Sequence, residues 1–457
     1  SWDEYFESIP TNKLPPLAEE DLASFAVEDG SAPEELEIRA YWCERLLDEA
    51  MERPWIVKDN PHVAAWLKAQ APALAKLNEL SKRPKFYSPQ VHEQPGGPLY
   101  EANDALVHGP IRKIPQLLKA RTMLAIGEGR LDDAISDWET SYLISGYLAD
   151  SPTVIHLLIG IACNGLTQES AYSIIFHPAV TQTQLQRMRS FRQRHICSYN
   201  AVKPFNIGER FFMLSSICNM ARSGEIDVFT DESKKWVEPT EPSSLRLLGR
   251  RLLWNFDTVM KNGNAVYDRM VEMQKIEDDG KRIEAWDEFD EYVNRVSKEA
   301  TPSEKHPFRY LARVVTREGR STLLSQVLEV LFSPALSAVN KAVVRSKVQN
   351  DLVELGLALV LYQKEHGKFP AKLEQLVPKY VKEIPPDRLN SRPLGYRSTG
   401  DGVLLYTASH DGIDSGGYND GNNDADDIAI FTPNMRPVKP KGAEGEKDAE
   451  SPPLESK

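Results

Sequence analysis

The chain has 457 residues and a mass of 51.5 kDa, enough for roughly two or three domains with buried apolar cores. Its 55 Lys and Arg against 67 Asp and Glu give a formal net charge of −12, which argues against a nucleic-acid backbone or an anionic membrane as the main partner. Divalent cations and basic protein surfaces fit this charge better. The four cysteines lack CxxC spacing, so neither a zinc site nor a dense disulfide framework is indicated.

No uninterrupted run reaches the length of about 18 apolar residues that a membrane-spanning helix needs, so we expect the chain as given to be soluble. The sequence begins at Ser1, without a methionine or a signal-like apolar region. This start is typical of a trimmed chain, from which a membrane anchor or export signal has been removed.

Residues 1–35 are acidic and rich in proline, which predicts an irregular lead-in that we expect Trp2, Tyr5 and Phe6 to anchor. Residues 36–340 carry apolar side chains at helical spacing and predict a mainly α-helical scaffold. Within it, a Gly-Glu-Gly-Arg break at 127–130 separates two apolar stripes, which indicates a helical hairpin like one tetratricopeptide unit. No repeat with a fixed period of about 34 residues follows. A short solenoid of such hairpins is therefore an alternative and not the main prediction.

The sequence contains none of the common catalytic motifs: GxSxG, GxxxxGK[ST], GxGxxG or HExxH. His156 lies in an apolar run, where a core histidine with a local hydrogen-bond partner is more common than a catalytic base. We therefore predict a non-catalytic protein. The alternative is a hydrolase-type enzyme whose site in the helical region is built from residues such as His156, His195 and Glu209.

Residues 345–433 combine a helix, turns and short strands, after a helix over 321–331 that we expect to stop before Pro334. Apolar residues at alternating steps of four and three predict one buried stripe on a helix that ends near His366 and Gly367. This stripe comprises Val348, Leu352, Leu355, Leu359 and Tyr362. Strands are predicted at 394–398, 403–409 and 427–431, with Asp401 and Gly402 supplying the positive φ angles of a hairpin turn.

An aspartate-rich loop, residues 409–426, lies between the second and third predicted strands. It contains five aspartates, three asparagines and four glycines, but no lysine or arginine. Gathering these carboxylates costs electrostatic repulsion, which a divalent cation would relieve. Calcium suits the loop best because it takes oxygen ligands, whereas the soft ligands that zinc prefers are absent. The spacing is not that of an EF-hand, and a solvated acidic loop is the alternative.

Several motifs of this region occur together in one known family. They are Tyr362, Gly367 and Pro370 after the helix, Ile384, Pro385 and Asp387 in the next turn, Tyr396, Arg397, Asp401, Gly402 and Tyr406 in the hairpin, Asp411 and Gly412 after it, and Ala-Asp-Asp-Ile at 425–428. This combination resembles the C-terminal globular part of the major pseudopilin of type II secretion systems. The resemblance implies a small α+β domain with a three-stranded antiparallel sheet and a structural Ca²⁺ ion. It places side-chain ligands at Asp411 and among Asp424, Asp426 and Asp427, with Asp414 as a further candidate.

The rest of the chain departs from a pseudopilin, which begins with a processed apolar helix. Here a long scaffold comes first and resembles that of large envelope proteins of planctomycete-type bacteria, a resemblance that implies no particular activity. We expect an extracytoplasmic protein of the cell envelope or of secretion, which binds protein partners and not nucleic acid. A tetratricopeptide-like adaptor is the remaining alternative. Residues 434–457 are charged and rich in proline and predict a disordered tail; the oligomeric state is left open.

Overall fold

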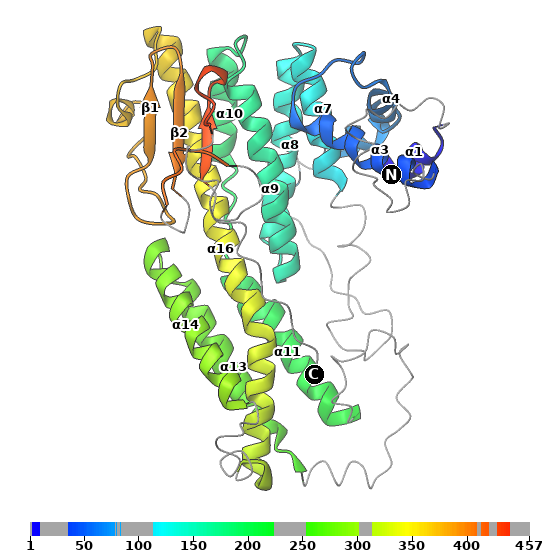
Figure 1. Cartoon of the computed structure of the whole chain (residues 1–457), viewed down its shortest axis with the longest axis vertical. Coiled ribbons are helices and arrows are strands. Elements are labelled where there is room, and N and C mark those ends of the chain that lie inside the picture. The colour runs from blue at the N-terminus through cyan, green and yellow to red at the C-terminus, as the bar shows by residue number, and fades with distance from the viewer. Residues whose placement is uncertain are drawn as a thin grey trace, which may run out of the picture. The chain divides into compact units, whose positions relative to one another are not determined.

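The computed structural model describes residues 2–9, 35–77, 79, 83, 113–223, 253–300, 313–408, 413–419 and 427–438. Helices dominate these residues, and the described strands form a small three-stranded antiparallel sheet, as the sequence predicts (Figure 1). The chain divides into two compact units. Unit 1 comprises Ser1–Ile174 and Ser190–Val343, and unit 2 comprises Ile175–Arg189 and Val344–Lys457.

Unit 1 begins with a short helix, α1 (Trp2–Glu7), where the sequence predicted an irregular segment. Buried Trp2 accounts for this order, since its Nε1 donates to the carbonyl oxygen of Cys43 (2.5 Å) and its ring centroid lies 5.2 Å from that of Trp66. The predicted anchoring is therefore confirmed for Trp2, and residues 10–34 of the lead-in lie outside the described residues. The next helices are α3 (Glu35–Glu52), α4 (Pro61–Ala69) and α5 (Ala71–Leu77).

The predicted helical hairpin is confirmed. Helices α7 (Lys113–Gly127) and α8 (Leu131–Ala149) pack side by side (Figure 1). Gly129 turns the chain with a φ of 74°, a conformation that costs glycine little. Gly127 is needed for a different reason, because a Cβ there would lie 2.0 Å from the carbonyl oxygen of Trp55.

The other helices of unit 1 share a second apolar core, in which the side chains of Phe205, Tyr267, Trp286 and Phe289 are almost completely buried. The charged run at 287–291 lies on α14, and its members Asp287 and Glu288 are exposed, as expected of a solvated face. The predicted loop at 224–244 lies outside the described residues. The helices concerned are α9 (Val154–Ile175), the π-helix η5 (Pro204–Glu209), α11 (Arg210–Ser223), α13 (Phe256–Gln274) and α14 (Asp279–Ala300). Helix α10 (Gln182–Arg194) adds no residue to this core, and residues 182–189 of it belong to unit 2.

Helix α16 (Arg317–His366) runs unbroken for 50 residues, so the predicted stop before Pro334 is wrong. Leu328 and Leu336, on either side of the proline, are 4% and 3% exposed in the core of unit 1. This burial offsets the cost of about 3 kcal/mol that a proline adds in a helix interior. Among the described helices, α16 alone is long and apolar enough to cross a membrane. This criterion considers only length and composition, and buried core helices also meet it. Half of the most apolar 18-residue segment of α16 is buried.

In unit 2, the predicted stripe on α16 is confirmed from Val348 to Leu359: Val348, Leu352, Leu355 and Leu359 are no more than 2% exposed. Tyr362, its last predicted member, is only half-buried. The helix ends as predicted at His366, and Gly367 follows with a φ of 76°. Val353 and Leu357 are also fully buried, so α16 is covered on more than one face. Residues 175–189, which the sequence placed in the scaffold, belong to this unit: Arg189 binds Glu354 (3.2 Å), and Ile175 lies against Gly356.

The sheet of unit 2 has the order β1-β2-β3, formed by β1 (Gly395–Ser398), β2 (Val403–Thr407) and β3 (Ile428–Phe431), close to the predicted limits (Figure 1). In the hairpin turn between β1 and β2, the residue with a positive φ is Gly400 (92°). The prediction that Asp401 and Gly402 supply the positive φ angles is therefore wrong. Four residues close the hairpin, as the predicted strand limits imply, and the N–H of Thr399 donates to the carbonyl oxygen of Gly402 (3.0 Å).

The two faces of the sheet differ because successive residues of a strand point to opposite sides. Leu405 and Ile430 are paired across the sheet, and Ile430 contacts Gly356 of α16, which makes theirs the inner face. Arg397 pairs with Leu404, and Leu404 pairs with Phe431, so these three lie on the outer face. Short 3₁₀ helices, η7 (Leu373–Leu376) and η8 (Pro433–Met435), precede and follow the strands.

Candidate functional site

Of the aspartate-rich loop, the structure describes residues 413–419, and it also describes Asp427, which directly follows the loop. Two of the five predicted calcium ligands, Asp414 and Asp427, are therefore placed. Asp411, Asp424 and Asp426 lie outside the described residues, as do all of residues 409–412 and 420–426. The geometry of the two placed aspartates shows how the loop is attached to the sheet.

Asp427 is fully buried at the start of β3. Its Oδ2 accepts hydrogen bonds from the backbone N–H groups of Ser415 (3.0 Å) and Gly417 (2.8 Å), and its carbonyl oxygen accepts one from Nδ2 of Asn419 (3.0 Å). Hydrogen bonds to an ionised acceptor are stronger than neutral ones. Asp427 thus anchors the returning loop to the strand on which the loop ends.

Asp414 binds the outer face of the sheet. Its Oδ1 accepts from the N–H of Gly416 (2.8 Å), and its Oδ2 accepts from the hydroxyl of Tyr406 on β2 (3.3 Å). Burial, and then this hydrogen bond to a carboxylate, raise the pKa of Tyr406, so the phenol stays a donor. Gly417 completes the contact, because its backbone approaches so closely that a Cβ would lie 3.1 Å from Leu404 Cδ1.

The donor set of this loop fits calcium. Ser415 links Asp414 and Asp427: it follows Asp414 in the chain, and its N–H donates to Oδ2 of Asp427. The loop offers carboxylate and carbonyl oxygens without any cysteine, as a hard cation prefers. Within the described ranges, however, no three His, Cys, Asp or Glu side chains gather at a possible metal position, so the described residues do not make a complete site.

Asp387 supports the same end of the sheet, a role that the sequence analysis missed. Its carboxylate accepts from the N–H of Leu389 (3.0 Å) and from Nδ2 of Asn390 (2.9 Å), and burial raises its pKa. Asn390 in turn donates to the carbonyl oxygen of Ala408 (2.7 Å), directly before the aspartate-rich loop. The Ile-Pro-Pro-Asp motif was the available signal, and its aspartate fixes the point from which the loop leaves β2.

A cleft of about 520 Å³ lies beside the loop, on the outer face of the sheet. We call it the outer cleft. The loop supplies one wall with Asp414, β1 supplies Arg397, and the segment after β3 supplies Arg436. Sequence reasoning named Arg397 only as part of the hairpin motif and did not connect it with Arg436, because the two stand 39 positions apart. The described residues that line it are Arg397, Leu404, Asp414, Ser415, Gly416, Asn434, Met435, Arg436, Pro437 and Val438.

The enzyme alternative rests on His156, His195 and Glu209, and unit 1 brings only two of them near each other. His156 is 1% exposed, its Nδ1 is hydrogen-bonded to Oγ1 of Thr153, and burial lowers its pKa. His195 packs on Phe191 and lines a separate cleft of about 260 Å³ with Cys197. Burial raises the pKa of Cys197 to about 11, so its thiol is a poor nucleophile at neutral pH.

Glu209 closes the π-helix η5, beside the first turn of α9. Its carboxylate accepts one long hydrogen bond from the N–H of Val154 (3.3 Å), next to the Thr153 that binds His156. Burial raises the pKa of Glu209 to about 6. Gly208 permits this approach, because a Cβ there would lie 2.2 Å from the carbonyl oxygen of Pro152. A carboxyl with this pKa is suited to proton transfer, but no substrate cavity containing it is described.

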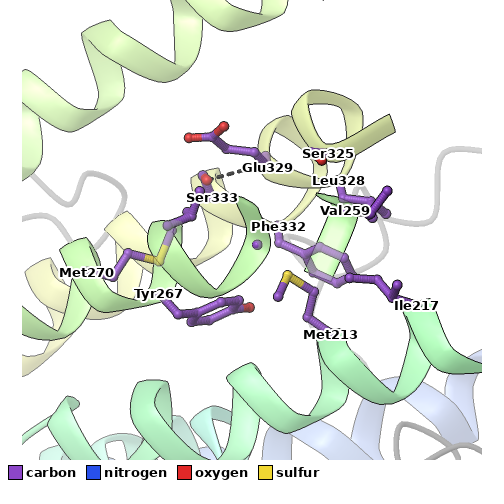
Figure 2. A pocket seen from close by; sticks show the side chains of 12 residues that line it. Met213, Ile217, Val259, Tyr267, Met270, Ser325, Leu328, Glu329, Phe332 and Ser333 are labelled. Carbon is purple, nitrogen blue, oxygen red and sulfur yellow. Dashed lines mark hydrogen bonds between the residues drawn. The ribbon is translucent and has the colours of Figure 1, made fainter. Parts of the chain in front are cut away.

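A further cavity lies among α11, α13 and α16 in unit 1, and its walls are almost entirely apolar (Figure 2). Its volume is about 10 Å³, the space of about one water molecule, so it is a packing gap and not a substrate site. Figure 2 shows the carboxylate of Glu329 directed away from the ring of Phe332. The labelled apolar residues are Met213, Ile217, Val259, Met270, Leu328 and Phe332.

Comparison with known proteins gives no information on the function of this site, so the site is interpreted from its geometry. The chain matches no family model, and neither the curated proteins nor the solved structures gave a match.

Proposed function

We propose that this chain is a non-catalytic protein of the cell envelope or of a secretion system, in which a calcium-stabilised, pseudopilin-like unit 2 presents a protein-binding surface. The aspartate-rich loop holds the ion, and the ordered loop forms one wall of the outer cleft. Asp411, Asp424, Asp426 and Asp427 supply side-chain ligands, with Asp414 beside them.

One observation carries this proposal. The described part of the loop is attached to the sheet twice, through Asp427 to Ser415 and Gly417 and through Asp414 to Tyr406. A long acidic loop gathered in this way concentrates carboxylates, and a divalent ion offsets their repulsion. Outside the cytoplasm, where calcium is abundant, a dissociation constant of about 0.1–1 mM suffices.

The test is thermal unfolding of the full chain in calcium and in chelator. Calcium at about 100 times its dissociation constant stabilises a one-site protein by about 2.7 kcal/mol. We expect a higher melting temperature in calcium, and we expect Asp411→Ala combined with Asp426→Ala to abolish the rise. An equal melting temperature with and without chelator would refute the proposal.

The matched control removes two carboxylates elsewhere. Asp287→Asn combined with Glu288→Gln takes two charges from the exposed face of α14, far along the chain from the loop. This control should keep the full calcium response, because it changes net charge by the same amount without touching a proposed ligand. Loss of the response in the control as well would mean that calcium acts through general charge screening.

A further inference from the structure

We infer that the outer cleft binds an acidic, extended segment of a partner protein, with the guanidinium groups of Arg397 and Arg436 as its recognition elements. This inference rests on the proposed function, because it names the chemistry of the partner that the proposed surface receives.

The charge of the cleft is the first argument. Among the described residues, two arginines and one aspartate line it, in a chain whose formal net charge is −12. The carboxylate of this aspartate, Asp414, is already engaged by Tyr406 and by the N–H of Gly416. Arg397 lies over the ring of Tyr406 at 6.0 Å, a contact that holds the guanidinium in place without neutralising it. No carboxylate within the described ranges forms an ion pair with Arg397 or Arg436.

The shape of the cleft is the second argument. It is about 520 Å³ and open, which is more than a single small anion needs. Besides the arginines it presents apolar surface from Leu404, Met435 and Val438, the last of which is 80% exposed. A peptide with an acidic side chain beside an apolar one would satisfy both kinds of wall. Arginine also suits carboxylates in particular, because its planar fork donates two parallel hydrogen bonds.

The backbone next to the cleft is the third argument. β1 is an edge strand of the sheet, and it carries Arg397. Edge strands accept an added peptide strand through their main-chain groups. An acidic segment that reaches the cleft along this edge would therefore gain hydrogen bonds that do not depend on its sequence, while the arginines select its charge.

The test measures binding of a fluorescein-labelled hexaglutamate peptide to the full chain by fluorescence polarisation, with a hexalysine peptide as the opposite-charge probe. We expect hexaglutamate to bind and hexalysine not to bind. Arg397→Gln combined with Arg436→Gln should weaken binding at least about tenfold, the scale of one lost charge-assisted hydrogen bond. Arg397→Lys should recover only part of the affinity, because it restores the charge but not the fork.

The matched control is Arg53→Gln combined with Arg295→Gln, which removes two exposed positive charges from unit 1. It should bind hexaglutamate like the unaltered chain. A sharper control is Asp414→Asn measured in chelator, which should strengthen binding, because it removes the negative charge from the cleft wall. A purely structural role of Asp414 would not produce that gain.

Three results would overturn the inference: equal binding by the double arginine variant, equal binding of hexalysine, or displacement of hexaglutamate by inorganic phosphate at comparable concentration. The last result would identify a small-anion site. Failure here is distinct from failure of the proposed function, since the calcium-dependent melt is measured without peptide. The inference is supported if peptide binding depends on both arginines, in calcium as well as in chelator.

Discussion

A carboxylate in each unit is shielded from water, and the two differ in the number of hydrogen-bond donors that they receive. Asp427 in unit 2 is fully buried and receives two backbone N–H groups at 3.0 Å or less. Glu209 in unit 1 is half-buried and receives one, at 3.3 Å. Hydrogen-bond donors favour the ionised form of a carboxylate, and burial favours the protonated form. The comparison separates an anchor, which holds a loop, from a group that is able to titrate near neutral pH.

The largest effect is expected at the anchor. Asp427→Ala leaves two amide groups without their acceptor, and hydrogen bonds to charged groups contribute about 1.5–3 kcal/mol each, so unit 2 should lose about 3 kcal/mol. Urea unfolding combined with hydrogen exchange of the β2 amides measures this. Asp401→Ala, at the exposed hairpin turn of the same sheet, is the control. Equal losses of unfolding free energy in the two variants would contradict the role of Asp427 as the anchor of the loop.

Glu209 should make the stability of unit 1 depend on pH. Its pKa is about 6 when folded, above the usual value of 4.5, so the folded chain holds the proton more tightly. The stabilisation is therefore complete at pH values below about 4.5 and is lost as the pH rises through 6, by at most about 2 kcal/mol. Glu209→Gln should remove this slope, as measured by urea unfolding from pH 4.5 to 8. An unchanged slope would assign the pH dependence to another group.

Gly417 tests how closely the anchored loop meets the sheet. Gly417→Ala meets both a φ of 86° and a contact of 3.1 Å to Leu404, and it should destabilise unit 2 by about 2 kcal/mol. Gly400→Ala is the matched control, because Gly400 has a φ of 92° but nothing within 4 Å of the added Cβ. It should cost about 1 kcal/mol, from backbone strain alone. Thermal unfolding that fails to separate the two variants would mean that the loop does not press on the sheet.

The smallest effect on stability is expected at Asp414. Asp414→Asn keeps one acceptor oxygen for the N–H of Gly416, and its Nδ2 is able to donate to the hydroxyl oxygen of Tyr406, so in chelator it should cost less than about 1 kcal/mol. If Asp414 contributes to calcium binding, the same variant should need more calcium to reach its half-maximal shift in melting temperature. A calcium titration followed by thermal unfolding separates the two contributions. An unchanged midpoint would remove Asp414 from the ligand set.

The sequence predicted local features of unit 2 well because their causes are local. The stripe from Val348 to Leu359 and the end of the helix at Gly367 follow from periodicity and from one flexible residue. The hairpin and its four-residue loop were predicted, but the positive φ lies at Gly400, because the Asp-Gly preference describes two-residue turns and does not fix the glycine of a four-residue loop.

Long-range features escaped prediction. Arg189 and Glu354 stand 165 positions apart, so no window on the sequence shows that residues 175–189 belong to unit 2. Pro334 was read as a stop because the packing of Leu328 and Leu336 was invisible. In the candidate site, all five aspartates looked alike, and only their hydrogen-bond partners distinguish the anchor Asp427 from Asp414 on the outer face.

The composition of unit 2 from two separated segments has a consequence for biosynthesis. Arg189 is synthesised 165 residues before Glu354 of α16, a delay of about 10–30 s at typical synthesis rates. During that interval the apolar side chains of Val180, Leu185 and Met188, buried in the finished protein, have no partner surface from α16. A gene fragment that starts at Val344 would never supply them. Expression of unit 2 by itself therefore calls for a fusion of residues 175–189 to residues 344–438.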